Sequence, residues 1–294
     1  MSRKAMWSCM PPAPNAVIAV IAATALSGCN AGIFDPHGPI GAADRLILVD
    51  SLAIMMVIGL PTILATLVFA WWFRASNRLA SYRPTWVYSG RLEVIVSVIP
   101  ALVVLFLGGI AWIGSHDLDP YQRLDSGKPP LEVEVVSMDW KWLFIYPDQG
   151  IASVNELVVP ASRPVHFRLT SATVMNSFFI PQLGSQIYTM PGMITELNLI
   201  ADQPGTYRGL SAQFSGDGFS DMKFDVHAVP DRDFTSWVAA AESGGPLDLN
   251  AYKTLLKPGT EPVPHVYNGV ASKLFDTVAM PPPRASVHPP VPES

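Results

Sequence analysis

Two long apolar segments in the first part of the chain restrict its fold more than any other feature of the sequence. The first runs from about 46 to 73, between Arg45 and Arg74, and its only charged residue, Asp50, lies near its start. The second runs from about 94 to 114 and carries no charge. As helices rising about 1.5 Å per residue, both are long enough to cross a hydrocarbon core of about 30 Å. We therefore predict a transmembrane helical hairpin within residues 29–120.

The N-terminus has the organisation of a secretory signal peptide. Arg3 and Lys4 precede an apolar run over residues 16–26, which is too short to span a bilayer. The run ends in Leu26-Ser27-Gly28-Cys29, which resembles the lipobox of bacterial lipoproteins. This resemblance implies removal of residues 1–28 and attachment of acyl chains, such as palmitate, to Cys29. The alternative is an ordinary cleavage site of small residues that happens to contain a cysteine.

Charges beside the two spans predict the orientation of the hairpin. The connecting segment is rich in arginine: Arg74, Arg78, Arg83 and Arg91. The outer flanks instead carry aspartates: Asp35, Asp44, Asp117 and Asp119. Arginine and lysine are enriched in cytoplasmic loops. We therefore expect the loop to be cytoplasmic, and the lipid-anchored N-terminus and the long C-terminal part to lie in the periplasm of a bacterium with an inner membrane.

Composition argues against several classes of function. With 49% hydrophobic and only 15% charged residues, the chain differs from an ordinary soluble protein. Its net charge of -5 offers no basic face for nucleic acid, and no Gly-rich phosphate loop is present. The two cysteines, Cys9 and Cys29, precede every segment that could fold in water. That part of the chain therefore contains no disulfide and no thiolate ligand for a metal.

Residues 125–230 show the alternation of half-buried strands. After a turn-rich linker at 125–130, Leu131, Val133 and Val135 alternate with glutamates, and a second alternating run follows at 165–170. Further short apolar runs at 140–145, 193–200 and 223–229 are separated by Pro and Gly. This pattern predicts an antiparallel β-sandwich. The six histidines have no metal-ligand spacing, and we expect them on the surface.

The pattern changes to helical after residue 230. Asp231 can cap a helix that carries Phe234 and Trp237, and Asp248 can cap a second helix that ends at Leu255. We predict an aromatic-rich helical extension over 231–280. The remaining residues, 281–294, are rich in proline and are predicted to be a disordered tail.

The stretch from 174 to 223 carries a specific resemblance. It contains Val174-Met175-Asn176-Ser177-Phe178-Phe179, then Met190-Pro191-Gly192, then a Gly- and Ser-rich loop that ends at Met222. This framework resembles the dinuclear copper (CuA) loops of cytochrome c oxidase subunit II, where the ligands are two Cys, two His, a Met and a backbone carbonyl. The corresponding positions here are Asn176, Ser211, Gln213, Ser215, Phe219 and Met222, of which Met222 alone is retained.

The same substitutions are typical of subunit II of the quinol-oxidising haem–copper oxidases, the cytochrome o ubiquinol oxidases in particular. This resemblance, over about residues 26–280, implies a cupredoxin-like sandwich that binds no cofactor itself. It implies a complex in which subunit I holds haem b, haem o and copper (CuB) and receives electrons from ubiquinol, with subunits III and IV as further partners. Such a complex reduces O₂ to water and pumps protons. Trp140, in a Trp-x-Trp segment that accepts electrons in the copper-bearing branch, is then expected to be a packing residue.

We expect no catalytic residue in this chain, and Glu93 is the candidate for proton entry. It precedes Pro100 by seven residues, as does a glutamate of oxidase subunit II that helps to admit protons to subunit I. A solvated acid at the start of a helix is the alternative, because a carboxylate at the membrane edge costs little.

Two other classes of protein compete with this interpretation. A membrane lipoprotein that binds or assembles other proteins through a cupredoxin fold, without enzymatic activity, would show the same segments. A copper-bearing cytochrome c oxidase subunit is excluded by the missing cysteines.

Overall fold

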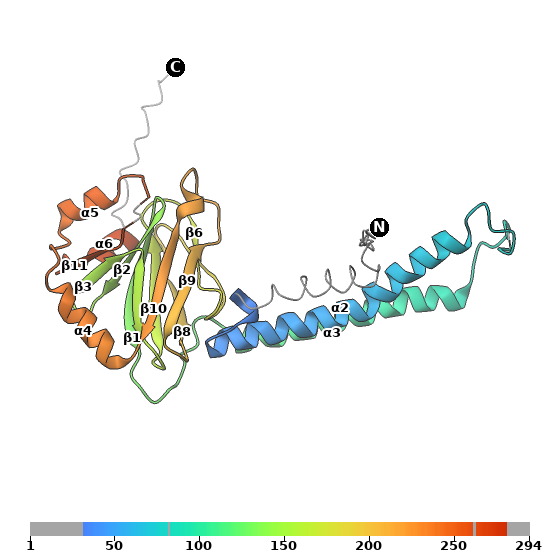
Figure 1. Ribbon diagram of the computed structural model, residues 1–294, viewed down its shortest axis with the longest axis horizontal. Helices are drawn as coiled ribbons and strands as arrows, with labels where there is room; N and C mark the ends of the chain where they lie inside the picture. Colours follow the sequence, from blue (N-terminus) through green and yellow to red (C-terminus); the bar gives the residue numbers. More distant parts are fainter. Residues whose placement is uncertain (1–31, 82, 261–262, 281–294) are drawn as a thin grey trace, which may run out of the picture.

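The computed structural model describes residues 32–81, 83–260 and 263–280, and it shows a helical hairpin that projects from one end of a β-sandwich (Figure 1). After a 3₁₀ turn, η1 (Gly32–Phe34), the hairpin consists of α2 (Pro39–Trp72) and α3 (Gly90–Asp117). Both helices are long and apolar enough to cross a membrane, and their apolar side chains are largely exposed. The two predicted spans are confirmed, but each helix extends beyond its apolar run. Helix α2 begins at Pro39 because its first turn is held by the sandwich rather than by lipid.

The sandwich consists of two sheets. One sheet has the strand order β11-β3-β2-β1-β5-β8, and the other has the order β4-β10-β9-β6-β7. Their bounds are β1 (Leu131–Met138), β2 (Lys141–Tyr146), β3 (Ile151–Val154), β4 (Glu156–Pro160), β5 (Val165–Ser171), β6 (Asn176–Phe179), β7 (Ile187–Thr189), β8 (Thr195–Leu199), β9 (Gly205–Ser211), β10 (Lys223–Val229) and β11 (His265–Asn268).

The prediction of an antiparallel sandwich is wrong at two places. Strand β1 pairs with β5 in parallel, and β4 pairs with β10 in parallel. Both pairs join strands that are distant in the sequence, whereas the hairpin neighbours β1 and β2, or β9 and β10, are antiparallel. Alternation identifies a strand and its buried face, but it carries no information on the direction of a distant partner.

The core between the sheets is aromatic. Leu131, Val133 and Val135 are buried there, as the alternation predicts. Phe178 stacks on Phe224 with ring centroids 5.2 Å apart, and further aromatic rings surround them: Trp142, Phe144 and Phe167. A Cβ atom at Gly209 would lie 2.1 Å from the Phe224 ring, so this position in β9 has to be glycine.

The C-terminal extension is part of the sandwich and not an appendage. It forms α4 (Asp231–Ala241), α5 (Leu249–Leu255), strand β11 and α6 (Leu274–Ala279). Helix α4 adds Phe234 and Ala241 to the core between the sheets. Helices α5 and α6 cover the opposite face of the β11-containing sheet, where they form a second core with side chains of β1, β2 and β3. Every residue of β2 is consequently buried. The sequence predicted the first two helices but not β11 or α6.

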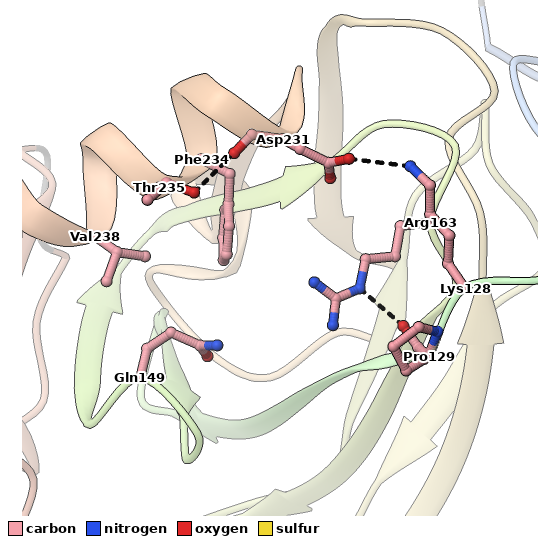
Figure 2. A pocket seen from close by; sticks show the side chains of 8 residues that line it. All are labelled: Lys128, Pro129, Gln149, Arg163, Asp231, Phe234, Thr235 and Val238. Atoms are coloured by element: carbon pink, nitrogen blue, oxygen red, sulfur yellow. Dashed lines mark hydrogen bonds and ion pairs between the residues drawn. The ribbon is translucent and has the colours of Figure 1, made fainter.

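The predicted helix cap at Asp231 is wrong. Helix α4 has Pro230 as its N-cap, and Asp231 is its first helical residue. The Asp231 carboxylate lies 3.0 Å from the Lys128 ammonium, beside a recess at the surface of the domain (Figure 2). In the same recess Arg163 donates to the Pro129 carbonyl at 2.8 Å. The linker is thus tied to the domain by both cations. The second cap is confirmed, because Asp248 accepts hydrogen bonds from the backbone of Asn250 and Ala251.

His166 is not the surface residue that the sequence predicted. Its side chain is 12% exposed, and its ring nitrogens lie 2.6 Å from Glu132 and 3.3 Å from Glu196. The three residues stand on neighbouring strands, where the parallel register places Glu132 beside His166. On the same face Arg168 pairs with Glu134, whose pKa is raised by burial even though Arg168 opposes the shift. The two glutamates provide polar partners for both ring nitrogens of this mostly buried histidine.

Backbone hydrogen bonds fasten the hairpin to the sandwich. The loop after β6 receives the start of α2: His37 N donates to Gln182 O at 2.7 Å, and Gly41 N to Leu183 O at 3.0 Å. The Ser185 hydroxyl adds a bond of 2.7 Å to the Asp44 carboxylate. The approach is close enough that a Cβ at Gly38 would lie 2.3 Å from the Ile200 carbonyl oxygen.

Candidate functional site

The copper-loop positions of the sequence meet at one end of the sandwich. Strand β6 carries Asn176, β9 ends at Ser211, and the loop 212–222 with its 3₁₀ turn η2 (Phe219–Asp221) carries the others. Backbone bonds join the three segments, because Ala212 N donates to Ser177 O and Ser211 N donates to Met222 O, each at 3.1 Å. The structure therefore brings together residues that are 46 positions apart (222 − 176 = 46).

Asn176 and Ser211 form the buried part of this site. The Ser211 hydroxyl lies 3.2 Å from the Asn176 side-chain oxygen and 3.2 Å from the backbone carbonyl oxygen of Gln213. The Asn176 amide nitrogen donates to Val174 O at 3.2 Å. Both side chains are almost inaccessible to water, so these bonds satisfy groups that would be costly to bury alone.

Ser215, Met222 and Phe219 form the part next to the loop. The Ser215 hydroxyl donates a weak bond to the Met222 sulfur at 3.8 Å, and Met222 is buried. Phe219 instead makes an edge-on contact with the Phe214 ring, with centroids 5.6 Å apart. A phenyl ring at this position adds apolar contact and no donor atom.

Trp140 supports the loop from the side, as the sequence predicts for a packing residue. Its indole nitrogen donates to Ser215 O at 3.1 Å. A Cβ at Gly218 would lie 2.4 Å from the indole ring, so the loop rests directly on it. Trp140 has a positive φ of 67° in the turn between β1 and β2, which is uncommon for a bulky residue. This conformation turns the ring toward the loop.

The side chains at this site do not suit copper. Copper centres of this kind use thiolate and imidazole ligands, whereas the groups here are hydroxyls, an amide, a phenyl ring and one thioether. Among the residues that the structure describes, no three His, Cys, Asp or Glu side chains are grouped so that they could hold a metal. No step of a reaction can be derived through a metal at these positions.

An exposed apolar patch surrounds the copper-loop positions, and sequence analysis did not identify it. Three of its residues precede Asn176 or Ser215 in the sequence, one stands opposite Ser177 in the β6–β7 register, and one lies in the turn between β7 and β8. All are at least 40% exposed: Val174, Met175, Phe214, Tyr188 and Met193. A phenylalanine inside a Gly- and Ser-rich loop was the available sequence indication. We call these five residues the apolar patch.

The other two predicted site residues lie elsewhere. Glu93 is exposed and lies in the first turn of α3. Helix α3 begins at the end of the hairpin that is far from the sandwich (Figure 1). Cys29 and the predicted signal peptide lie outside the described residues, as does the predicted tail at 281–294. The copper-loop positions and Glu93 are therefore far apart in the structure, at the sandwich and at the distant end of the hairpin.

Part of the chain is similar to a known family model and to a solved domain. Residues 149–229 match the family model described as cytochrome c oxidase subunit II, periplasmic domain. Among solved structures, the periplasmic domain of subunit II of cytochrome oxidase from Bradyrhizobium japonicum is 27% identical, with a TM-score of 0.37, over 40% of this chain and 96% of that one.

Full-length relatives identify the family. Cytochrome bo(3) ubiquinol oxidase subunit 2 of Pseudomonas aeruginosa is 45% identical over 251 residues, which cover 85% of this chain and 76% of the relative. Ubiquinol oxidase subunit 2 of Acetobacter aceti is 46% identical, over 86% and 83%. Quinol oxidase subunit 2 of Bacillus subtilis is 38% identical, over 79% and 74%. The chain belongs to the ubiquinol oxidase subunit 2 family, and it is an inner-membrane subunit of an oxidoreductase complex with a periplasmic domain.

The geometry of the site generates a prediction about copper. The Gln213 carbonyl and the Met222 sulfur already lie beside Ser211 and Ser215. We therefore expect the 125–280 fragment with Asn176→His, Ser211→Cys, Ser215→Cys and Phe219→His to bind two coppers and to show the purple absorption of a mixed-valence thiolate pair. Loss of the Phe219 ring should cost on the order of 1–3 kcal/mol of stability, which metal binding would offset.

The control is the same fragment with Ser211 left unchanged, which lacks one bridging thiolate and should not give the purple centre. Metal content and absorption are measured after passage over a chelator, and circular dichroism verifies the fold. If the folded quadruple variant binds no more copper than the parent, the alignment of this loop with the copper-bearing family is wrong.

Proposed function

We propose that this chain is the copper-free subunit II of a proton-pumping terminal oxidase that oxidises ubiquinol and reduces O₂ to water. The observation that carries the proposal is the set of Asn176, Ser211, Ser215 and Phe219 at the positions of copper ligands, in a framework that still assembles them. Asn176 and Ser211 hydrogen-bond each other, Ser211 also lies within hydrogen-bond distance of the Gln213 carbonyl oxygen, and the Ser215 hydroxyl donates to the Met222 sulfur.

The absence of a copper ligand set fits a lipid-soluble electron donor. Ubiquinol reaches a membrane subunit from within the bilayer, so a periplasmic entry point for electrons has no use. On this proposal haem b, haem o and CuB all belong to subunit I, and this chain carries none of the redox centres. This chain then contributes to the assembly and capping of subunit I, and Glu93 contributes to proton entry.

The apolar patch supports a role as the cap of subunit I. Exposed methionine and aromatic side chains that gather in one place on a water-soluble domain are typical of protein interfaces. The patch is connected to the membrane helices through β6 and the loop 180–185, which is bonded to α2. A domain held in this way can present the patch toward a neighbouring membrane subunit. Subunits III and IV would complete the complex.

The function is tested by purifying the affinity-tagged full-length chain from its native membrane. We expect a haem-bearing subunit I to co-purify, and the complex to consume O₂ with ubiquinol but not with reduced cytochrome c. Haem spectra, subunit mass spectrometry and an oxygen electrode provide the measurements. A chain that is recovered folded and without haem would favour the non-enzymatic lipoprotein, and oxidation of cytochrome c would contradict the assignment.

We propose that Glu93 admits protons to subunit I from the cytoplasm. It is exposed in the first turn of α3, at the end of the hairpin opposite the periplasmic domain. Glu93→Gln should lower ubiquinol oxidase turnover while the haem content stays unchanged, since a proton donor is lost and no redox centre is touched.

Glu93→Asp, which keeps the carboxylate, is the matched variant and should retain most of the turnover. Rates are compared across the working pH range in purified complex. Equal rates for wild type and Glu93→Gln at every pH would contradict the proposal. Glu93 would then be a solvated acid that only stabilises the N-terminus of the helix.

We propose that Cys29 becomes the acylated N-terminus of the mature chain and adds a lipid anchor in the periplasmic leaflet. The hairpin holds the protein in the membrane far more strongly than acyl chains do. Cys29→Ala should therefore lose the acyl mass but remain in the membrane fraction. Intact mass spectrometry decides the point, and a chain that begins at Met1 without added mass would disprove the anchor.

A further inference from the structure

The loop between α2 and α3 forms an open cavity at one end of the hairpin. The loop lies at the end of the hairpin far from the sandwich, which is the cytoplasmic end (Figure 1). The cavity has a volume of about 810 Å³ and is open to the outside. Its polar wall includes Arg74, Asn77 and Arg83, and its apolar wall includes Trp72, Phe73 and Trp86.

Two arginines are held in place in this cavity with part of each guanidinium free. Arg74 donates to Trp71 O at 2.9 Å and to the Ser76 hydroxyl at 3.1 Å, and it lies over the Trp71 ring. Arg83 donates from Nε to the Ser81 hydroxyl at 3.2 Å. Within the part of the chain that the structure describes, neither arginine has a carboxylate partner. The sequence from 74 to 92 contains no Asp or Glu at all.

Because the loop has no acidic side chain, the charge of these two arginines can be neutralised only by an anion from outside the loop. A guanidinium donates through parallel N–H groups, a geometry that fits the oxygens of a phosphate. The side chains beside them would hold an apolar body, because Phe73 is 59% exposed and Trp86 is 61% exposed. Tryptophan at this level belongs to the headgroup region of a bilayer. A phospholipid has both features, because its anionic phosphate is joined to apolar acyl chains and lies at the depth of the headgroups.

We propose that this cavity is a binding site for the phosphate of an anionic phospholipid in the cytoplasmic leaflet. Arg74 and Arg83 bind the phosphate oxygens, and Trp72, Phe73 and Trp86 pack against the glycerol and the first part of the acyl chains. Free phosphate would leave the aromatic wall unused. The inference does not rest on the copper loop or on Glu93, so it holds or fails separately from the proposed function.

The test uses the full-length chain in its complex, in lipid nanodiscs that contain a photoactivatable phosphatidylglycerol. We expect light-dependent cross-linking to the segment 72–86, read by peptide mass spectrometry and competed by phosphatidylglycerol more strongly than by phosphatidylcholine. Arg74→Gln with Arg83→Gln should weaken the binding of phosphatidylglycerol by about tenfold or more beyond any general effect of loop charge, since the charge-assisted hydrogen bonds to the phosphate oxygens are lost.

Arg78→Gln with Arg91→Gln is the matched control. It removes the same charge from the same end of the hairpin, with Arg78 in the loop and Arg91 in the first turn of α3, and neither residue lines the cavity. If the control weakens binding as much, the attraction is a general property of loop charge and the site does not exist. Both variants keep two arginines on the cytoplasmic side, and protease accessibility of the periplasmic domain verifies their orientation.

Three further results would overturn the proposal. Inorganic phosphate that competes as well as phosphatidylglycerol would make the ligand a free anion. Cross-links from 72–86 to another subunit in place of lipid would show that a protein covers the cavity. Wild-type binding in the single variant Arg83→Gln would also count against the site. This variant removes one hydrogen bond to Ser81 and serves if the double variant does not assemble.

Discussion

A few hydrogen bonds between the loop after β6 and the start of α2 determine where the whole periplasmic domain stands on the membrane. They join backbone to backbone, so they do not depend on flexible side chains. The contact requires Gly38 and Gly41, because a Cβ at either residue would overlap a carbonyl oxygen of the sandwich. The same loop continues directly from β6, which carries Asn176. Membrane helix, anchoring loop and copper-loop position thus form one continuous unit, and the apolar patch beside them has a fixed height above the bilayer.

Ordinary polar contacts fill the positions that the resemblance assigns to copper ligands. Ser211 and Asn176 are buried, and a buried hydroxyl or amide without a partner would destabilise the fold. Their mutual contact and the nearby carbonyl of Gln213 remove this penalty. Phe219 replaces ligand chemistry by an aromatic contact with Phe214. The loop therefore keeps its shape through hydrogen bonds, packing on Trp140 and its glycines, all of which are properties of the protein alone.

Much of this could be predicted from the sequence, because the relevant information is local. Apolar runs longer than a bilayer is thick predict the hairpin, and the alternation at Leu131, Val133 and Val135 predicts the buried face of β1. The copper-loop residues were brought together by the fold as their spacing indicated. The failures concern partners distant in the sequence. The parallel pairing of β1 with β5 places Glu132 beside His166, which alternation cannot reveal. The ion pair of Asp231 with Lys128 likewise joins residues 103 positions apart, which local patterns do not indicate.

The position of β2 has a consequence for how the domain is completed after export. This strand lies in the middle of a three-layer arrangement, and the layer that covers one of its sides comes from α5 and α6, more than a hundred residues later in the chain. Contacts of such long sequence separation form late and slowly. Leu143 and Ile145 remain open to solvent until the segment around 250–279 has crossed the membrane. A nascent chain that is stalled before that point carries an apolar sheet face, and it is a natural substrate for periplasmic chaperones and proteases.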